Sequence, residues 1–344
     1  MSEAEFRTKR RQKFLTEHYF KFNNIDIARS IGNFQAVVIR EKSEDTRDPT
    51  SHGQIFKKKF DLLRLHYTAG EPIETLKPLY NEAMHWFREW HEAYRAYVLR
   101  LAEESGEELR KDGTPTRFEY LGDFQLVLDC FSIGVLLGET SQVHEAAKWL
   151  ERYRHTDMLF EFLIERFVSD PSETETFFHE EPYGPLVDAI FTADTPQEAE
   201  AFVKQYLDNW YKAFEGIPWH NGHLKATDEY MPYEGYWAFD AAAVCILKGI
   251  DDSSFRDHMV YPKDLADWAR EHVAGTLSGE ANRALQSPPN VPANAPCPTA
   301  GWWFTPAKPD SRRYFKQGDP MPSLGGDYGE TFWQWSPDQS APKL

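Results

Sequence analysis

Two pairs of residues in this sequence have the types and spacing that metal chemistry uses. His220 and His223 are separated by two residues, so with nearby acids they could ligate the metal of a hydrolase. Glu82 and His85 form a Glu-x-x-His step, but a di-iron bundle needs a second such step, and the sequence has none. The histidine pair falls in an irregular segment without a fixed third ligand. We therefore interpret it as a loop pair and keep a metal-dependent hydrolase as the alternative function.

A run of short acids offers a second kind of chemistry. Asp251, Asp252 and Asp257 surround Arg256, and such a cluster could serve general acid–base catalysis. A helix-connecting turn held by an ion pair between Arg256 and a carboxylate, with Asp257 as one candidate, explains the same residues, and we favour it. The sequence contains no HExxH, Walker, dinucleotide-binding or G-x-S-x-G motif. We therefore predict no catalytic residue, no metal ligand and no cofactor, and expect that the protein is not an enzyme.

The elements that surround these residues are organised by the stretch 233–270. From Tyr236 to Leu247 only Asp240 is charged, so a helix here has no solvated face and must lie in the middle of a larger helical body. Its alanines allow neighbouring helices to approach closely, while Tyr236, Trp237 and Phe239 fill the space between them. The pattern predicts a buried central helix.

Two segments of the chain resemble a known group of families. The stretch YEGYWAFDAAAVCILKGIDDSSFRDHMVYPKDLADWAR resembles the C-terminal signature of the PoNi-like immunity proteins of bacterial polymorphic toxin systems, and of the related immunity protein 71 and 72 families. Residues 297–303, 311–315 and 318–322 are similar to the aromatic tail of the immunity protein 71 and 72 type. The signature residues, which we expect to be structural, are Tyr236, Trp237, Phe239, Asp251, Asp252, Ser253, Arg256, Asp257, Trp303 and Arg313.

This resemblance implies a function in binding rather than catalysis. Such proteins bind and neutralise a cognate antibacterial toxin, and some partners of PoNi-like proteins are DNases. Together with the charge described below, the resemblance indicates a nuclease toxin, with type VI secretion as one route of delivery. A helical scaffold for a partner other than a toxin is the second alternative. We expect no direct contact with nucleic acid or membrane, and the oligomeric state stays open.

The charge of the chain is strongly and unevenly negative. The net charge is −17 at pH 7, yet residues 1–64 contain 14 Lys and Arg against 9 Asp and Glu, a net of +5, and residues 170–240 contain 15 acids against 3 bases, a net of −12. Phosphate backbones require clustered Lys and Arg, so we predict a basic protein partner. An acidic surface that is merely solvated is the open alternative. The candidate toxin-binding residues are Glu173, Glu175, Glu180, Glu181, Asp228, Glu229 and Glu234.

The apolar periodicity predicts an all-α fold, with a multi-helix, bundle-like body and a small irregular or β-containing aromatic C-terminal tail. We expect a helix over 3–29 that continues over 31–40 after a bend at Gly32. Later helices are expected over 73–104, 121–137, 141–168 and 196–214, and tail strands around 302–305, 313–316 and 331–335. Pro- and Gly-rich breaks divide the chain into an N-terminal helical domain (1–170), a C-terminal helical immunity-type domain (171–285) and a Pro- and Trp-rich tail packed on the helical body (286–344).

The cysteines and the apolar runs of the sequence indicate the cellular compartment of the protein. Cys130, Cys245 and Cys297 are far apart in sequence, and we interpret them as buried thiols rather than a disulfide framework or a zinc site. The N-terminus lacks an apolar signal region, and no apolar run has the length of a membrane span. We therefore expect a cytoplasmic protein.

Overall fold

The computed structural model describes residues 2–44, 48–106, 113–168, 170, 174–273, 275, 291–305, 308, 311–323 and 331–336. The chain divides into two compact units, residues 1–277 and residues 278–344. The first is helical and the second contains a small sheet, so the predicted fold class, an all-α body with a β-containing tail, is confirmed.

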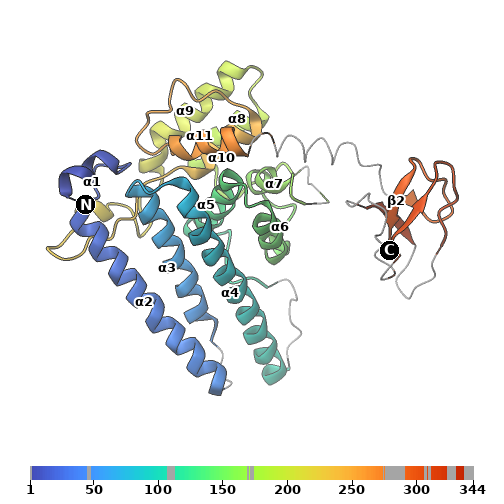
Figure 1. Cartoon of the computed structure of the whole chain (residues 1–344), viewed down its shortest axis with the longest axis horizontal. Coiled ribbons are helices and arrows are strands. Elements are labelled where there is room, and N and C mark those ends of the chain that lie inside the picture. The colour runs from blue at the N-terminus through green and yellow to red at the C-terminus, as the bar shows by residue number, and fades with distance from the viewer. Residues whose placement is uncertain are drawn as a thin grey trace. The chain divides into compact units, whose positions relative to one another are not determined.

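The helical body begins with four helices, of which the last three are long. They are α1 (Glu3–Lys9), α2 (Glu17–Glu44), α3 (Pro49–Thr68) and α4 (Leu76–Ser105), with a short 3₁₀ turn η1 (Ile73–Thr75) before α4. Figure 1 shows α2, α3 and α4 side by side, with α3 in the middle. The aromatic stripe of α4 faces its neighbours, and Tyr80, Phe87 and Trp90 are buried as core residues.

Shorter helices gather at one end of these three (Figure 1). They are α5 (Leu121–Leu137), α6 (Thr140–Trp149), α7 (Met158–Ile164), α8 (Glu180–Phe191), α9 (Pro196–Ala213), α10 (Phe239–Lys248) and α11 (Lys263–His272), with 3₁₀ turns η2 (Glu151–Tyr153) and η3 (Gly222–Leu224). α5 and α10 are apolar on nearly every side and pack against each other. One hydrophobic core runs from Phe6 to Val273 and includes residues on both sides of position 170. The three-part division of the chain stays a prediction.

The first predicted helix is broken at a different place from the one expected. The chain leaves the helical path between α1 and α2, whereas Gly32 lies inside the continuous helix α2. The reason is a long-range contact: Gln12 is 3% exposed, and its side-chain amide donates to the carbonyls of Tyr236 (2.6 Å) and Met259 (2.9 Å). Such a buried amide needs partners from another part of the fold, and local periodicity does not reveal them.

The central buried helix also starts later than predicted. α10 begins at Phe239, and Tyr236 and Trp237 lie before it in a buried, irregular segment. The Tyr236 N–H donates to the Gln12 side-chain oxygen (2.9 Å), and the Ala238 N–H donates to the Val260 carbonyl (2.9 Å). These backbone groups are satisfied by tertiary partners, so the segment is buried without being helical.

The helix expected over 141–168 is divided into α6, η2 and α7. α6 ends at Trp149, and after η2 the chain turns at His155, whose φ of 63° lies in the left-handed region. Asp157 then caps α7 by accepting from the Phe160 N–H (2.8 Å). At this corner Arg154 donates to both carboxylate oxygens of Glu161 (2.9 and 3.2 Å), with both side chains buried. A buried bidentate ion pair thus holds the turn between the two helices.

Two helices agree closely with their sequence patterns. α5 has the expected bounds, and its C-cap Gly138 is left-handed with a φ of 73°. At α9, the Thr195 hydroxyl accepts from the Glu198 N–H (3.2 Å) as an N-cap. The C-terminal end of α5 and the N-terminal end of α9 could be predicted because their sequence signals are local.

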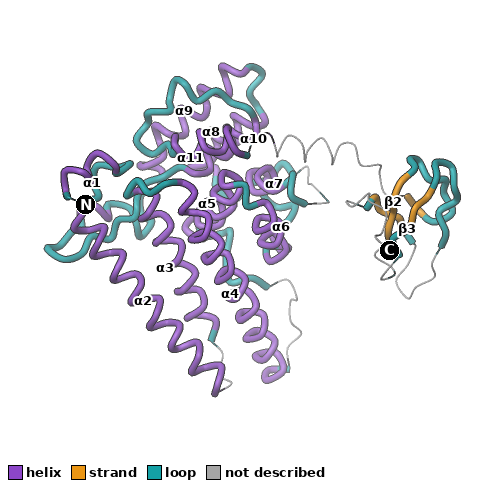
Figure 2. The backbone as a smooth tube through the Cα atoms, in the orientation of Figure 1, coloured by secondary structure: helices purple, strands orange, loops and turns teal. Residues whose placement is uncertain are grey.

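The second unit contains a small antiparallel sheet (Figure 2). Its strands are β1 (Val291–Pro292), β2 (Gly301–Phe304), β3 (Arg313–Phe315) and β4 (Phe332–Trp335), in the order β1-β4-β2-β3. Trp303 and Trp333 are 0% exposed and form its core with Phe315 and Cys297. This unit therefore has a core of its own, and the predicted packing of the tail on the helical body stays a prediction.

All three cysteines are free and buried, as predicted. Among the described helices, none combines the length and the apolar character needed to cross a membrane.

Candidate functional site

One group of the predicted toxin-binding acids lies at α8. Glu175 is exposed just before this helix, and Glu180 and Glu181 are exposed in its first turn. Two carboxylates at a helix N-terminus are also favourable for the helix itself, because its N-terminal end is partially positive. Glu173 lies outside the described residues.

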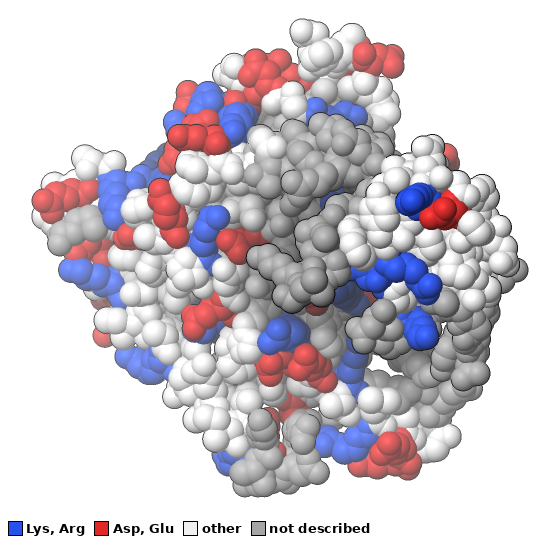
Figure 3. Space-filling view, turned by 45° about the vertical axis from the view of Figure 1, so that its right-hand side comes forward, with Lys and Arg blue, Asp and Glu red and all other residues white. Residues whose placement is uncertain are grey.

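A second group of these acids lies in the loop between η3 and α10. Asp228 and Glu229 are exposed there. The loop lies against the start of α2, where the Tyr19 hydroxyl donates to the Thr227 carbonyl (2.7 Å). Its contacts thus differ from those of α8, which packs against α9 and α10. On the face of the body shown in Figure 3, acidic side chains are interspersed with Lys and Arg.

Glu234 differs from the exposed acids because it lies in the wall of a cavity of about 410 Å³, here called the Glu234 cavity. Arg64, Asp61 and Asp129 line the same cavity. Burial raises the pKa of the Glu234 carboxyl to about 7, and repulsion from Asp61 adds to the shift. This acid is therefore not a simple solvated charge.

The signature turn 251–257 is held by ion pairs, as the structural interpretation predicts. Asp252 is 2% exposed and accepts from Arg270 (2.6 Å), Arg256 (3.3 Å) and the Tyr261 hydroxyl (2.9 Å). At the exposed edge of the turn, the Asp251 carboxylate accepts from the Ser253 N–H (3.0 Å).

The suggested partner of Arg256 was wrong. Asp257 is exposed and pairs with Lys263 (2.7 Å), while the guanidinium of Arg256 pairs with Asp252 and with Asp267 (2.6 Å). Asp267 belongs to α11, so the turn is tied to the next helix rather than closed on itself. This network of ion pairs stabilises the turn and its contact with α11, and it supports the structural interpretation of these acids over a catalytic one.

The histidine pair is occupied by aromatic contacts. His223 Nδ1 lies 2.7 Å from the Tyr236 hydroxyl, and the His220 ring packs on the Tyr211 ring at 4.3 Å between centroids. Within the described part of the chain, no three His, Cys, Asp or Glu side chains are placed to hold a metal ion. The geometry thus adds no support for a metal-dependent hydrolase.

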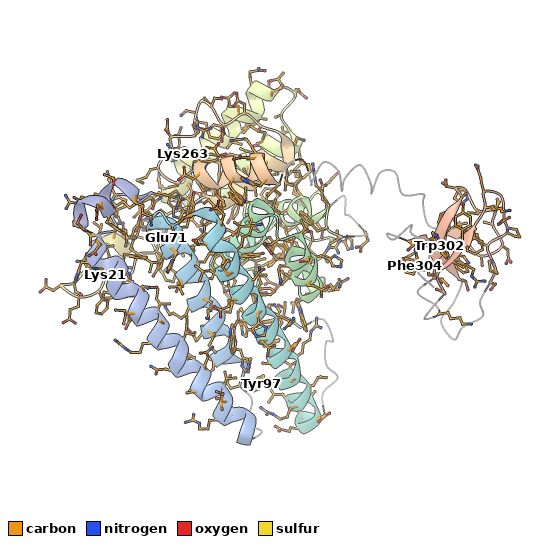
Figure 4. The ribbon with its side chains drawn as sticks, viewed as in Figure 1. Lys21, Glu71, Tyr97, Lys263, Trp302 and Phe304 are labelled. Carbon is orange, nitrogen blue, oxygen red and sulfur yellow. The ribbon has the colours of Figure 1, made fainter. Side chains whose placement is uncertain are left out.

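The tail signature residues lie in and beside the sheet core. Trp303 is buried in β2, and the Arg313 guanidinium lies over the Trp333 ring at 4.8 Å. Trp302 and Phe304, labelled in Figure 4, alternate with the buried Trp303 along β2, and both are partly exposed. The signature residues of the tail therefore stabilise its own small core.

Sequence reasoning missed the residues that line the cavity beside Glu234. Asp129 could have been recognised from the sequence, because it is a lone charged residue within the apolar second half of α5. Asp61 and Arg64 carry no such signal, since charged residues are ordinary on an amphipathic helix such as α3.

The comparisons with known proteins define the class. Two family models match in succession: "PoNe immunity protein (PoNi), N-terminal" over residues 9–149 and "PoNe immunity proteins (PoNi), C-terminal" over residues 155–265. Together they cover most of the chain, and the resemblance seen in the signature segment is confirmed. The chain belongs to the PoNe immunity protein family, whose members are immunity proteins of polymorphic toxin systems.

A solved structure has a similar fold. The crystal structure of protein PA2201 from Pseudomonas aeruginosa superposes with a TM-score of 0.59 over 78% of this chain and 94% of that chain, at 21% sequence identity. A likeness at this identity concerns the fold alone. No curated protein matches the chain in sequence.

Proposed function

We propose that this immunity protein neutralises a nuclease toxin by binding over the toxin's active site, so that nucleic acid cannot enter. The observation that carries the proposal is the location of the charge. Residues 278–344 contain 6 Lys and Arg and 6 Asp and Glu, a net of zero, so the whole net charge of −17 belongs to residues 1–277. A nuclease must present basic groups to phosphates, and an acidic body complements them.

The proposed contact surface consists of the two acidic groups. One contains Glu173, Glu175, Glu180 and Glu181 at α8, and the other contains Asp228 and Glu229 with Glu234 beside them. The toxin arrives from a neighbouring cell, with type VI secretion as the proposed route, and is met in the cytoplasm. The protein acts by binding, without catalysis or a cofactor. Charge at the rim of such an interface speeds the encounter more than it slows dissociation.

Charge reversal tests this surface. We expect the triple variant Glu175→Lys, Glu180→Lys, Glu181→Lys and the double variant Asp228→Lys, Glu229→Lys to lower the association rate with the cognate toxin by roughly tenfold at low salt. Raising the ionic strength from 0.1 to 1 M shortens the screening length from about 10 to about 3 Å, so salt should mimic the variants. Stopped-flow mixing measures both effects.

The matched control reverses acids at the far end of α4, Glu103→Lys with Glu104→Lys, which are also exposed. These variants should keep the association rate of the parent. If the α8 and loop variants kept it as well, electrostatic capture by these acids would be rejected.

A further inference from the structure

The Glu234 cavity lies between helices and the segment that leads into α10. Its walls come from α3, α5, residues 217–219, Pro232 and Glu234. Trp219 forms an aromatic part of the wall, and its ring is fixed because the indole N–H donates to the Gln125 side chain (3.0 Å). With a volume of about 410 Å³, the cavity has room for a long side chain and water.

Two carboxylates at this cavity have fewer hydrogen-bond partners than the buried carboxylate of Asp240. Asp240 accepts from the Tyr206 hydroxyl (2.7 Å) and the Ala241 N–H (2.7 Å). Asp129 is 4% exposed, yet among the described residues none donates a hydrogen bond to its carboxylate. The Glu234 carboxylate is met only by its own backbone N–H within the described chain. Asp129 is thus a buried acid without a protein donor among the described residues and Glu234 a half-buried one, and both line the cavity, where an entering group can reach them.

The cations that face the cavity do not supply the missing partners. Lys58 pairs with Asp61 (3.2 Å), and the Lys57 ammonium lies over the Trp90 ring at 5.5 Å. The Arg64 guanidinium donates to the Gly235 carbonyl at 3.5 Å, and in the described structure it forms no ion pair with either carboxylate. Asp123, at the rim, accepts from the Arg117 N–H (3.1 Å). With its carboxyls ionised, the cavity thus has an excess of negative charge.

We propose that the Glu234 cavity receives one Lys or Arg side chain of the toxin, held between Asp129 and Glu234 beside the ring of Trp219. The inference rests on the proposed function, since the toxin is the basic partner. A guanidinium or ammonium group brings several donors to the two carboxylates that lack them, and it is attracted to an aromatic face. The loop that reaches the cavity wall at Pro232 and Glu234 also carries the exposed acids Asp228 and Glu229, whose charge attracts cations to this loop.

Occupation of the cavity by a cation has a consequence for pH. In the free protein, burial raises the pKa of Glu234 to about 7 and the pKa of Asp129 well above its ordinary value. Repulsion from Asp61 opposes ionisation of Glu234, and repulsion from Asp240 opposes that of Asp129. Arg64 favours ionisation of both carboxyls, and Lys58 favours that of Glu234. An inserted cation stabilises the ionised carboxylates, so binding releases protons. Affinity should therefore rise as the pH rises through 7.

Calorimetric titration of the full chain with the cognate toxin at pH 6 and pH 8 tests the proposal. The parent should bind about tenfold more tightly at pH 8 than at pH 6. Glu234→Gln and Asp129→Asn keep the shape of the side chains, and each should weaken binding at pH 8 by at least tenfold. Glu234→Gln should also reduce the pH effect to less than twofold, because it removes the carboxyl whose pKa lies near 7. Glu215→Gln, an exposed acid outside the cavity, is the matched control and should match the parent.

Melting curves separate binding from folding. Both amide variants should melt at or above the temperature of the parent at pH 8, because each replaces a carboxyl whose ionisation is opposed by desolvation. If both variants bound the toxin as tightly as the parent at both pH values, the proposed role of the Glu234 cavity would be overturned and the proposed function would stand. If the parent itself bound no toxin, the proposed function would be overturned. Spermidine is the probe for a small-cation site: stabilisation of the parent by spermidine, with toxin affinity unchanged in the variants, would also overturn the proposal.

Discussion

Replacing Trp237 with alanine is expected to destabilise the helical body by about 3 to 5 kcal/mol, the usual cost of deleting a large buried aromatic side chain. Trp237 is 5% exposed, and its ring meets the Tyr67 ring edge-on at 4.8 Å between centroids. Its indole N–H donates to the Thr68 hydroxyl (2.8 Å), so the substitution leaves a cavity and also removes one hydrogen bond. Phe239→Ala, at 1% exposure, should cost a similar amount.

Urea unfolding followed by circular dichroism measures this effect. Leu224→Ala is the matched control, because this side chain is 71% exposed and its loss should change the unfolding free energy by about 0.5 kcal/mol or less. Equal unfolding midpoints for Trp237→Ala, Phe239→Ala and the parent would show that the segment before α10 is not packed in the interior.

The variant Glu161→Ala is expected to cost about 3 to 5 kcal/mol, because it leaves the guanidinium of Arg154 buried without its main partner. Arg154 and Glu161 have side chains 5% and 2% exposed, and Glu161 also accepts from the His155 N–H (2.7 Å). Asp170, whose carboxylate lies 3.2 Å from Arg154, is 59% exposed and replaces only part of the lost interaction.

Two comparisons identify the cause of that loss. Glu145→Ala breaks an exposed ion pair with Lys148 (2.7 Å) and should cost less than about 1 kcal/mol. Replacing Arg154 and Glu161 together by leucine should recover most of the stability lost in Glu161→Ala, since apolar residues often substitute for a buried pair at little cost. A double variant as unstable as the single one would contradict this account of the pair.

The parts of the fold that could be predicted from sequence are those with local signals. α5 is an apolar run that ends at a left-handed glycine, and α9 follows a threonine cap and a proline. The tail strands follow short aromatic runs bounded by Gly and Pro. The break after α1 and the late start of α10 were missed for one shared reason: Gln12 bonds to Tyr236, a residue 224 positions away. No periodicity contains that contact.

The sequence predicted which residue types form the candidate site, but it did not predict how those residues are arranged in space. The acids of residues 170–240 stand out by composition. Their distribution between α8 and the loop at 228–229 depends on the path of the chain. Glu234 was grouped with the exposed acids because its neighbours in sequence are polar or aromatic. Its cavity is made by Asp61 and Arg64 of α3 and Asp129 of α5, which sequence proximity does not connect.

The most direct test of the central claim, that this protein binds and neutralises a toxin, is a titration of the cognate toxin's enzymatic domain with the full chain while DNA cleavage is measured. A dedicated immunity protein must hold every toxin molecule, so we expect a dissociation constant of about 1 nM or below, roughly −12 kcal/mol, and loss of cleavage at one immunity protein per toxin. A micromolar dissociation constant, or tight binding with DNA cleavage unchanged, would contradict it.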